Sequence, residues 1–327
     1  MGLKNFAIAA LLLMAAPVHA DVAQAVNDRI LPGLAAFRTA TQALSDAAAR
    51  TCAPDELRPL WNAAFDAWLP VSFLRLGPGE EQGRALAIAF WPDPKGIGAK
   101  QQRQMLQAQD PVVNDPAGFA ERSVALRGLF GLERLLYPAQ PPSGDYPCAL
   151  TRATAADLAR MAAEIDQGWR DGFAATLTSA GQPGNTTYLT ETEARQALFT
   201  QMMTGFEFTA DQRLGRPLGS FDRPRPERAE ARASGRSQRN VELSLQSLLS
   251  FAEVLAGPLP ETRADVDRAL TAARALDDPD FAGFAKPQGH VRAEALLGLV
   301  QAARDSAGLE AGDALGVTVG FNSADGD

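Results

Sequence analysis

The clearest chemical pattern in this chain lies in the segment 128–133, which reads Gly-Leu-Phe-Gly-Leu-Glu. A histidine and a glutamate three residues apart on a helix share one face and can bind the same metal ion. In a G-x-H-x-x-E motif the histidine would stand where this chain has Phe130, whereas Gly128 and Glu133 match the motif. A phenyl ring cannot replace the nitrogen ligand, so the chemistry of this segment depends on what Glu133 contacts.

Two interpretations of Glu133 are open. A carboxyl group on an inward helical face is either a structural group held by hydrogen bonds, or one ligand of an all-oxygen metal site completed by another acidic residue. Glu207 is the candidate for that second ligand, because it stands among aromatic residues in Gly205-Phe206-Glu207-Phe208. Oxygen ligands suit ferric iron or calcium, and no spacing in the sequence fixes a coordination set.

The sequence offers little for hydrolytic catalysis. After residue 20 the chain has one histidine, His290, so the H-E-x-x-H zinc site of many peptidases cannot be assembled. No G-x-S-x-G nucleophile motif is present either. Asp93 lies in the turn-forming stretch 91–96 (WPDPKG), where we interpret it as a turn former or a helix cap.

An arginine-rich segment could bind an anion. Residues 213–239 contain eight arginines against three acids, Asp222, Glu227 and Glu230. Guanidinium groups hold carboxylates through paired hydrogen bonds, so a ferric chelate or an acidic partner protein would fit this segment. The alternative is a solvated loop with no ligand.

The first 20 residues read as a signal peptide. Lys4 precedes an apolar run that ends near Pro17, and the small-x-small sequence Val18-His19-Ala20 predicts cleavage after Ala20. The apolar run is too short for a membrane-spanning helix. We therefore expect export. A net charge of −8 argues against a nucleic-acid partner.

The only two cysteines, Cys52 and Cys148, are far apart in the sequence. In an oxidising compartment such a pair most simply forms one disulfide bond. A thiolate or metal site would need a neighbouring histidine or metal motif, and the sequence has neither.

Apolar residues recur at helical spacing along the chain, and no segment alternates with period two. Within residues 54–72, Leu57, Trp61, Phe65 and Trp68 share one face. The sequence thus predicts an all-α protein. The helices are expected within 54–72, 100–109, 117–137, 151–180, 191–214, 241–256 and 262–276.

The proline-rich stretch 138–147 (PAQPPSGDYP) can form neither a helix nor a central strand, so we place a domain boundary there. The expected domains are 21–147 and 148–327, each a helical bundle. The sequence Arg-Leu-Gly at 75–77 returns at 213–215, each time followed by proline and glycine, and a duplication would explain this echo.

Several segments together resemble the imelysin-like family of exported helical proteins. They are FDAWLPVSFLRLGPG (65–79), FWPDPKG (90–96), GLFGLERLLY (128–137), YLTETEARQALF (188–199), DQRLGRPLG (211–219), SGRSQRNVELSLQSL (234–248) and GVTVGFNSADGD (316–327).

The resemblance implies two four-helix-bundle-like domains that face each other across a cleft, a periplasmic location and a role in bacterial iron uptake. The family's G-x-H-x-x-E motif, proposed to bind metal, corresponds to Gly128, Phe130 and Glu133, with the histidine replaced. We therefore expect the cleft to receive iron, an iron chelate or an iron-transport protein of the periplasm or inner membrane. A peptidase, as the family name suggests, and a scaffold without a ligand are the alternatives.

Overall fold

Helices build the described chain, and the one bridge between extended residues pairs Ser220 with Arg223. The computed structural model describes residues 21–318, so the expected signal peptide lies outside the described residues. The α-helices in chain order are α1 (Val22–Ala25), α2 (Leu31–Arg50), α3 (Pro54–Trp68), α4 (Arg84–Ile88), α5 (Ile97–Ala108), α6 (Pro116–Ala120), α7 (Gly128–Leu136), α8 (Asp145–Gly168), α9 (Ala174–Thr178), α10 (Glu191–Glu207), α11 (Arg216–Leu218), α12 (Ser237–Ala256), α13 (Pro260–Leu276) and α14 (Pro287–Leu315). The predicted all-α class is confirmed.

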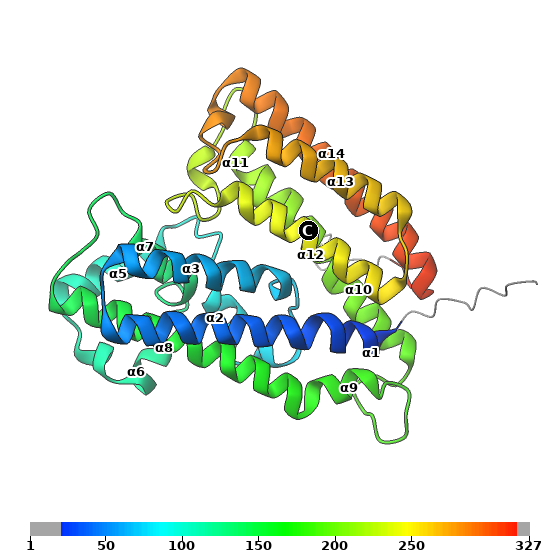
Figure 1. Ribbon diagram of the computed structural model, residues 1–327, viewed down its shortest axis with the longest axis horizontal. Helices are drawn as coiled ribbons and strands as arrows, with labels where there is room; N and C mark the ends of the chain where they lie inside the picture. The colour runs from blue at the N-terminus through cyan, green and yellow to red at the C-terminus, as the bar shows by residue number, and fades with distance from the viewer. Residues whose placement is uncertain (1–20, 319–327) are drawn as a thin grey trace, which may run out of the picture.

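One group of helices gathers around α2. Helices α3 and α8 pack along α2, and the short helix α7 packs against both α3 and α8 (Figure 1). The predicted apolar face of α3 is buried, because Leu57, Trp61, Phe65 and Trp68 are each at most 3% exposed. Trp68 contacts Phe37 of α2 with ring centroids 5.0 Å apart, so aromatic side chains fill the space between these two helices.

The second group consists of α10, α12, α13 and α14, with α13 and α14 paired at the top of Figure 1. Local hydrogen bonds fix where these helices begin. The Thr190 hydroxyl accepts from the backbone N–H of Glu193 at the start of α10. The Glu310 carboxylate of α14 accepts from the N–H groups of Glu261 and Thr262, so it caps α13 and ties the two helices together.

Three helices continue without interruption through π-helical turns. Helix α1 joins α2 through Val26–Ile30, α8 joins α9 through Trp169–Phe173, and α10 joins α11 through the longer stretch Phe208–Gly215. Such turns add residues to the helical repeat and often lie next to functional sites.

The predicted disulfide bond between Cys52 and Cys148 is present, with Cα atoms 5.3 Å apart. It joins the link between α2 and α3 to the first turn of α8. The expected domain boundary at residue 147 falls inside that same turn. Helix α8 therefore runs across the boundary as one element, and it packs on α2 and α7, which come from before the boundary.

The prediction of one helix over residues 117–137 is wrong. Helix α6 ends at Ala120, tight turns follow, and α7 starts at Gly128. Gly128 has φ +66°, which is the left-handed region that favours glycine. A Cβ atom at this position would lie 2.1 Å from the Ala87 carbonyl oxygen, so the end of α4 dictates both the glycine and the break.

Within residues 21–318, no helix has both the length and the apolar character that a membrane crossing requires.

Removing the disulfide bond should lower the free energy of unfolding by about 3–5 kcal/mol, since the bond closes a long loop in the unfolded chain. The loop is long because the two cysteines are 96 positions apart. We expect the variant Cys52→Ala/Cys148→Ala to unfold at a lower guanidinium concentration with an unchanged helical circular dichroism spectrum. An unchanged unfolding midpoint would contradict this expectation.

Candidate functional site

The segment 128–133 forms the first part of α7 and is buried. Gly128 begins α7 where the chain passes over the end of α4, and Phe130 and Glu133 follow on one face of the helix. The Phe130 ring packs edge-on against Phe65 of α3, with centroids 5.7 Å apart, and it is 5% exposed. The residue that stands in the place of the motif's histidine is thus part of the α3–α7 core.

Glu133 is buried, with 6% of its surface exposed, and its carboxylate has defined partners. The oxygen Oε1 accepts a hydrogen bond from the backbone N–H of Ser234 at 3.0 Å and a second from the Ser234 hydroxyl at 2.7 Å. Burial raises the pKa of Glu133, while these hydrogen bonds and the nearby charge of Arg134 act in the opposite direction. The geometry matches the structural interpretation of this residue.

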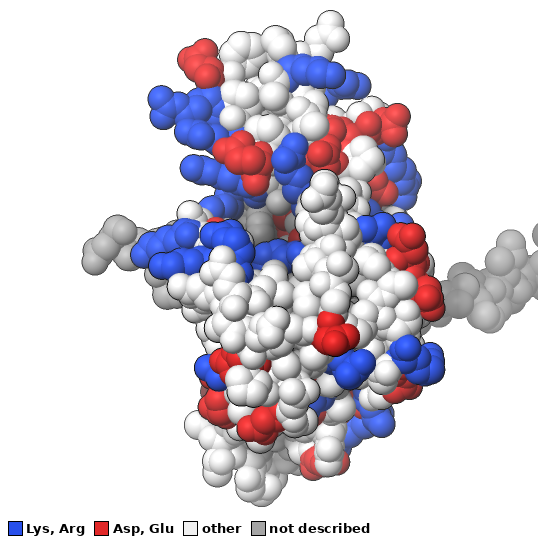
Figure 2. Space-filling model, turned by 90° about the vertical axis from the view of Figure 1, so that its left-hand side faces the viewer, with Lys and Arg blue, Asp and Glu red and all other residues white. Residues whose placement is uncertain are grey.

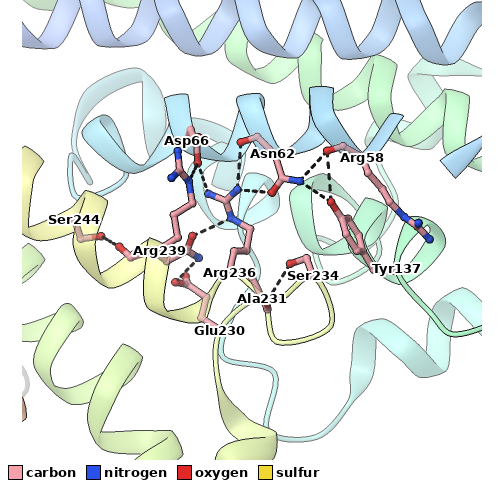
Figure 3. Close-up of polar contacts among 11 residues, drawn as sticks. Arg58, Asn62, Asp66, Tyr137, Glu230, Ala231, Ser234, Arg236, Arg239 and Ser244 are labelled. Atoms are coloured by element: carbon pink, nitrogen blue, oxygen red, sulfur yellow. Dashed lines mark hydrogen bonds and ion pairs between the residues drawn. The ribbon is translucent and has the colours of Figure 1, made fainter. Parts of the chain in front are cut away.

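Ser234 belongs to the segment 219–236, which crosses from the second group of helices to the first. The segment is fixed there by Arg236, which is 2% exposed. Its guanidinium donates to the Asn62 side chain at 2.6 Å and to Asp66 at 2.6 Å, both on α3, and to Asn240 at 3.0 Å (Figure 3). It also lies 4.7 Å from the centroid of the Phe65 ring.

Asp66 accepts from two arginines at once, since Arg239 also donates to both of its carboxylate oxygens. Burial by itself would raise the pKa of Asp66, but the hydrogen bonds from Arg239 and Arg236 outweigh it and lower the pKa. On the other side of Arg236, the Asn62 amide donates to the Tyr137 hydroxyl at 2.7 Å. This network therefore links α3, the end of α7 and the start of α12.

Glu230 makes a second buried contact in the same segment. Its Oε2 atom accepts from Arg213 at 2.7 Å and from the Asn240 amide at 2.9 Å. The side chains of Arg213 and Glu230 are 6% and 5% exposed, so they form a buried ion pair. Since Asn240 also contacts Arg236, the two buried arginines are joined through one amide side chain.

An opening of ≈490 Å³ lies above Phe130 and Glu133. The turn Trp91–Pro94, residues 227–229 and 231–233, and Arg216 line it together with these two residues. Figure 2 shows Lys and Arg side chains gathered around a hollow on this side of the molecule. Three arginines contribute to the lining: Arg216, Arg228 and Arg232.

The acids of the opening already have partners. Asp93 caps α5 by accepting from the N–H groups of Ile97 and Gly98 at 2.9 and 2.8 Å, which is the capping role expected for it. Glu133 is bound by Ser234, and Glu227 lies 3.6 Å from Arg225.

Two of the three arginines are unpaired by comparison. Arg232 is 3.5 Å from Asp280, whereas Arg216 and Arg228 form no ion pair with any residue between 21 and 318. The Nε atom of Arg216 is also buried without a hydrogen-bond partner among those residues. Arg216 and Arg228 thus bring guanidinium groups to the opening that have no ion-pair partner within residues 21–318.

A metal ion finds no ready ligand set. Over the described residues, no group of three or more His, Cys, Asp or Glu side chains is arranged to hold one. Glu133 uses Oε1 for Ser234, and Glu207, at the end of α10, is not among the residues that line the opening beside Glu133. These residues do not fit a resident metal site of the G-x-H-x-x-E type.

Sequence reasoning missed the partners of Glu133 and of α3. Ser234 and Arg236 lie in the segment 234–248 that carried part of the family resemblance, but no local pattern relates Ser234 to a residue 101 positions earlier. His290 is buried and its Nδ1 atom lies 3.3 Å from the Phe284 carbonyl oxygen, so it packs within the second group of helices.

The fold and these contacts define an all-helical, disulfide-bonded protein built around an altered G-x-H-x-x-E segment. Residues 30–306 match the family model described as Imelysin, so the chain belongs to the imelysin family.

The crystal structure of an imelysin-like protein from Psychrobacter arcticum 273-4 superposes with a TM-score of 0.73. The match covers 92% of this chain and 96% of that chain at 18% sequence identity, which supports the shared fold. A comparison with curated protein sequences finds no match.

The titration of Glu133 should affect stability. Because its pKa is raised in the folded state, its favourable contribution is complete below the unfolded-state pKa and is lost as pH rises through the folded-state pKa. The variant Glu133→Gln does not titrate and can still accept from Ser234. We expect the melting temperature of the wild type to fall relative to that of Glu133→Gln between pH 4 and pH 8.

The matched control is Glu121→Gln, which changes an exposed glutamate. Thermal unfolding at each pH measures the difference for both variants. If the wild type instead gained stability relative to Glu133→Gln as the pH rose, ionisation of the buried Glu133 carboxyl group would not destabilise the fold, and the prediction would be wrong.

Proposed function

We propose that this imelysin-family protein is an exported binding protein of bacterial iron uptake, which receives an anionic iron chelate at the opening above Phe130 and Glu133. The observation that carries the proposal is the pair of arginines in this opening that lack an ion-pair partner. Its acids are engaged by other groups, while Arg216 and Arg228 form no ion pair within residues 21–318. Guanidinium groups in such a setting favour a ligand with carboxylate oxygens.

The engagement of Glu133 supports chelate binding over direct iron ligation. Oε1 of Glu133 already accepts two hydrogen bonds from Ser234, so only Oε2 could face a metal ion, and one carboxylate oxygen is a poor ligand set by itself. The Phe130 ring closes the place from which an imidazole would reach the same metal ion. In this proposal the iron arrives with its own ligands and the protein recognises their charge.

The expected periplasmic location and the signal peptide belong to the same proposal. A binding protein of this kind would release its chelate to an iron-transport protein of the periplasm or inner membrane. Peptidase chemistry gains no support from the geometry, because His290 is buried and contacts the Phe284 carbonyl.

Ferric citrate is the probe for this opening. Isothermal titration with ferric citrate should give saturable binding, and the variant Arg216→Gln/Arg228→Gln should weaken it at least about tenfold, as expected for lost charge-assisted hydrogen bonds. The control Arg29→Gln/Arg50→Gln removes two exposed arginines that do not line the opening. It should bind as the wild type does.

Two outcomes would contradict the proposal. If Arg216→Gln/Arg228→Gln bound ferric citrate as tightly as Arg29→Gln/Arg50→Gln does, the opening would not be the binding site. Equal affinity for iron-free citrate would show that the protein recognises the anion and not the iron chelate.

Restoring the motif should not create an iron site. In Phe130→His the carboxylate of Glu133 remains bound to Ser234, and no further cluster of ligands lies nearby among the described residues. We expect neither the wild type nor this variant to retain ferrous iron after gel filtration, as measured by elemental analysis. Retention of about one iron per chain by Phe130→His would show that the other ligands of a metal site are in place.

A further inference from the structure

A second, smaller cavity shares Trp91 with the opening above Glu133. It has a volume of ≈50 Å³ and is lined by the end of α3 with the residues that follow it, Ala89 and Trp91, the end of α10 with the π-helical stretch after it, Glu230, and α12. A water molecule needs about 10–15 Å³ by this measure, so the cavity has room for a ligand the size of a few waters.

The walls of this cavity are largely aromatic. Trp68, Phe73, Trp91 and Phe208 all line it, and the Trp91 and Phe208 rings meet edge to face with centroids 5.9 Å apart. Gly205 brings α10 close to the opposite wall, because a Cβ atom there would lie 2.9 Å from Cβ of Phe73. The α10 backbone therefore lies close to Phe73 at one edge of the cavity, and the aromatic rings enclose the rest of it.

Two arginines reach the same cavity, and their situations differ. Arg213 is paired with Glu230 at 2.7 Å, donates to Thr209 at 3.3 Å, and lies 4.8 Å from the centroid of the Phe208 ring. The Arg75 guanidinium forms no hydrogen bond and no ion pair with any residue between 21 and 318. The two guanidinium groups and the single carboxylate leave one positive charge.

The backbone of Arg75 is fixed by a hydrogen bond, whereas its guanidinium has no such partner among residues 21–318. Its backbone N–H donates to the Gln201 side chain of α10 at 2.6 Å. Burial lowers the pKa of Arg75, Arg213 lowers it further, and Glu80 acts in the opposite direction. A partly buried cation of this kind is stabilised when an anion binds beside it.

The polar groups of the cavity narrow the choice of anion. The Ser72 and Ser244 hydroxyls already donate to the carbonyl oxygens of Leu69 and Asn240. Thr204 also lines the cavity, and its hydroxyl has no hydrogen-bond partner among the described residues. The Arg75 guanidinium can hold both oxygens of a planar carboxylate, and the aromatic walls can contact an apolar body, which a phosphate lacks.

We propose that the cavity around Arg75 is a binding site for a small organic monocarboxylate, whose carboxylate pairs with Arg75 and Thr204 and whose apolar part contacts Trp68, Trp91 and Phe208. The site is separate from the opening above Glu133 and does not depend on its function. Trp91 lines both sites.

Propionate is the probe, because its size matches the cavity. Titration at constant ionic strength should change the tryptophan fluorescence saturably, since Trp68 and Trp91 line the site. Propylamine should give no such change. Inorganic phosphate should bind at least about tenfold more weakly than propionate, because it has no apolar part to contact the aromatic walls and meets a single unpaired cation.

Variants of Arg75 test whether propionate binds in this cavity. Arg75→Gln should weaken propionate binding at least about tenfold, and Arg75→Lys should retain part of the affinity because it keeps the charge. Arg50→Gln, which removes an exposed arginine that does not line the cavity, should bind propionate as the wild type does. Melting temperatures confirm that each variant is folded.

The proposal is overturned if the wild type shows no saturable response to propionate, or if folded Arg75→Gln binds propionate as tightly as the wild type. The variant Arg216→Gln/Arg228→Gln should bind propionate normally. A failure of ferric citrate binding and a failure of propionate binding are therefore separate results.

Discussion

The buried guanidinium of Arg236 is the contact on which the arrangement of the polar region depends. Moving a charged group out of water costs several kcal/mol, and the cost is offset only when the hydrogen bonds around the charge are well formed. Arg236 meets this condition through Asn62, Asp66 and Asn240, and it lies over the Phe65 ring. These contacts hold the start of α12 against α3 and thereby place the preceding segment over α7.

That placement gives Glu133 its role. Since the segment 219–236 is anchored at its end, Ser234 is positioned to donate both of its hydrogens to one carboxylate oxygen. The same segment supplies Arg228 to the opening and Glu230 to the cavity, so one stretch of chain contributes to both. Loss of the motif's histidine is accommodated because Phe130 joins the apolar core beside Phe65. A motif that elsewhere suggests ligation has here become part of the packing between helices.

Local periodicity was enough to predict α3, because the spacing of Leu57, Trp61, Phe65 and Trp68 places all four on one helical face, which is buried. The disulfide bond was equally accessible, since the chain offers one possible pair. The break before α7 could not be predicted, because it is imposed by the carbonyl of Ala87 in another element. The partner of Glu133 is likewise remote in the sequence, and only the folded chain brings the two together.

The π-helical stretch Phe208–Gly215 has a consequence for how this family could diverge. In a regular helix each additional residue rotates everything that follows by about 100°. Arg213 lies inside the stretch, and its inward direction toward Glu230 therefore depends on the wider helical repeat. Deletion of a single codon here would restore ordinary winding and turn this guanidinium away from its partner. Relatives that differ in length at this point would consequently differ in the charge of the cavity while keeping the same helices.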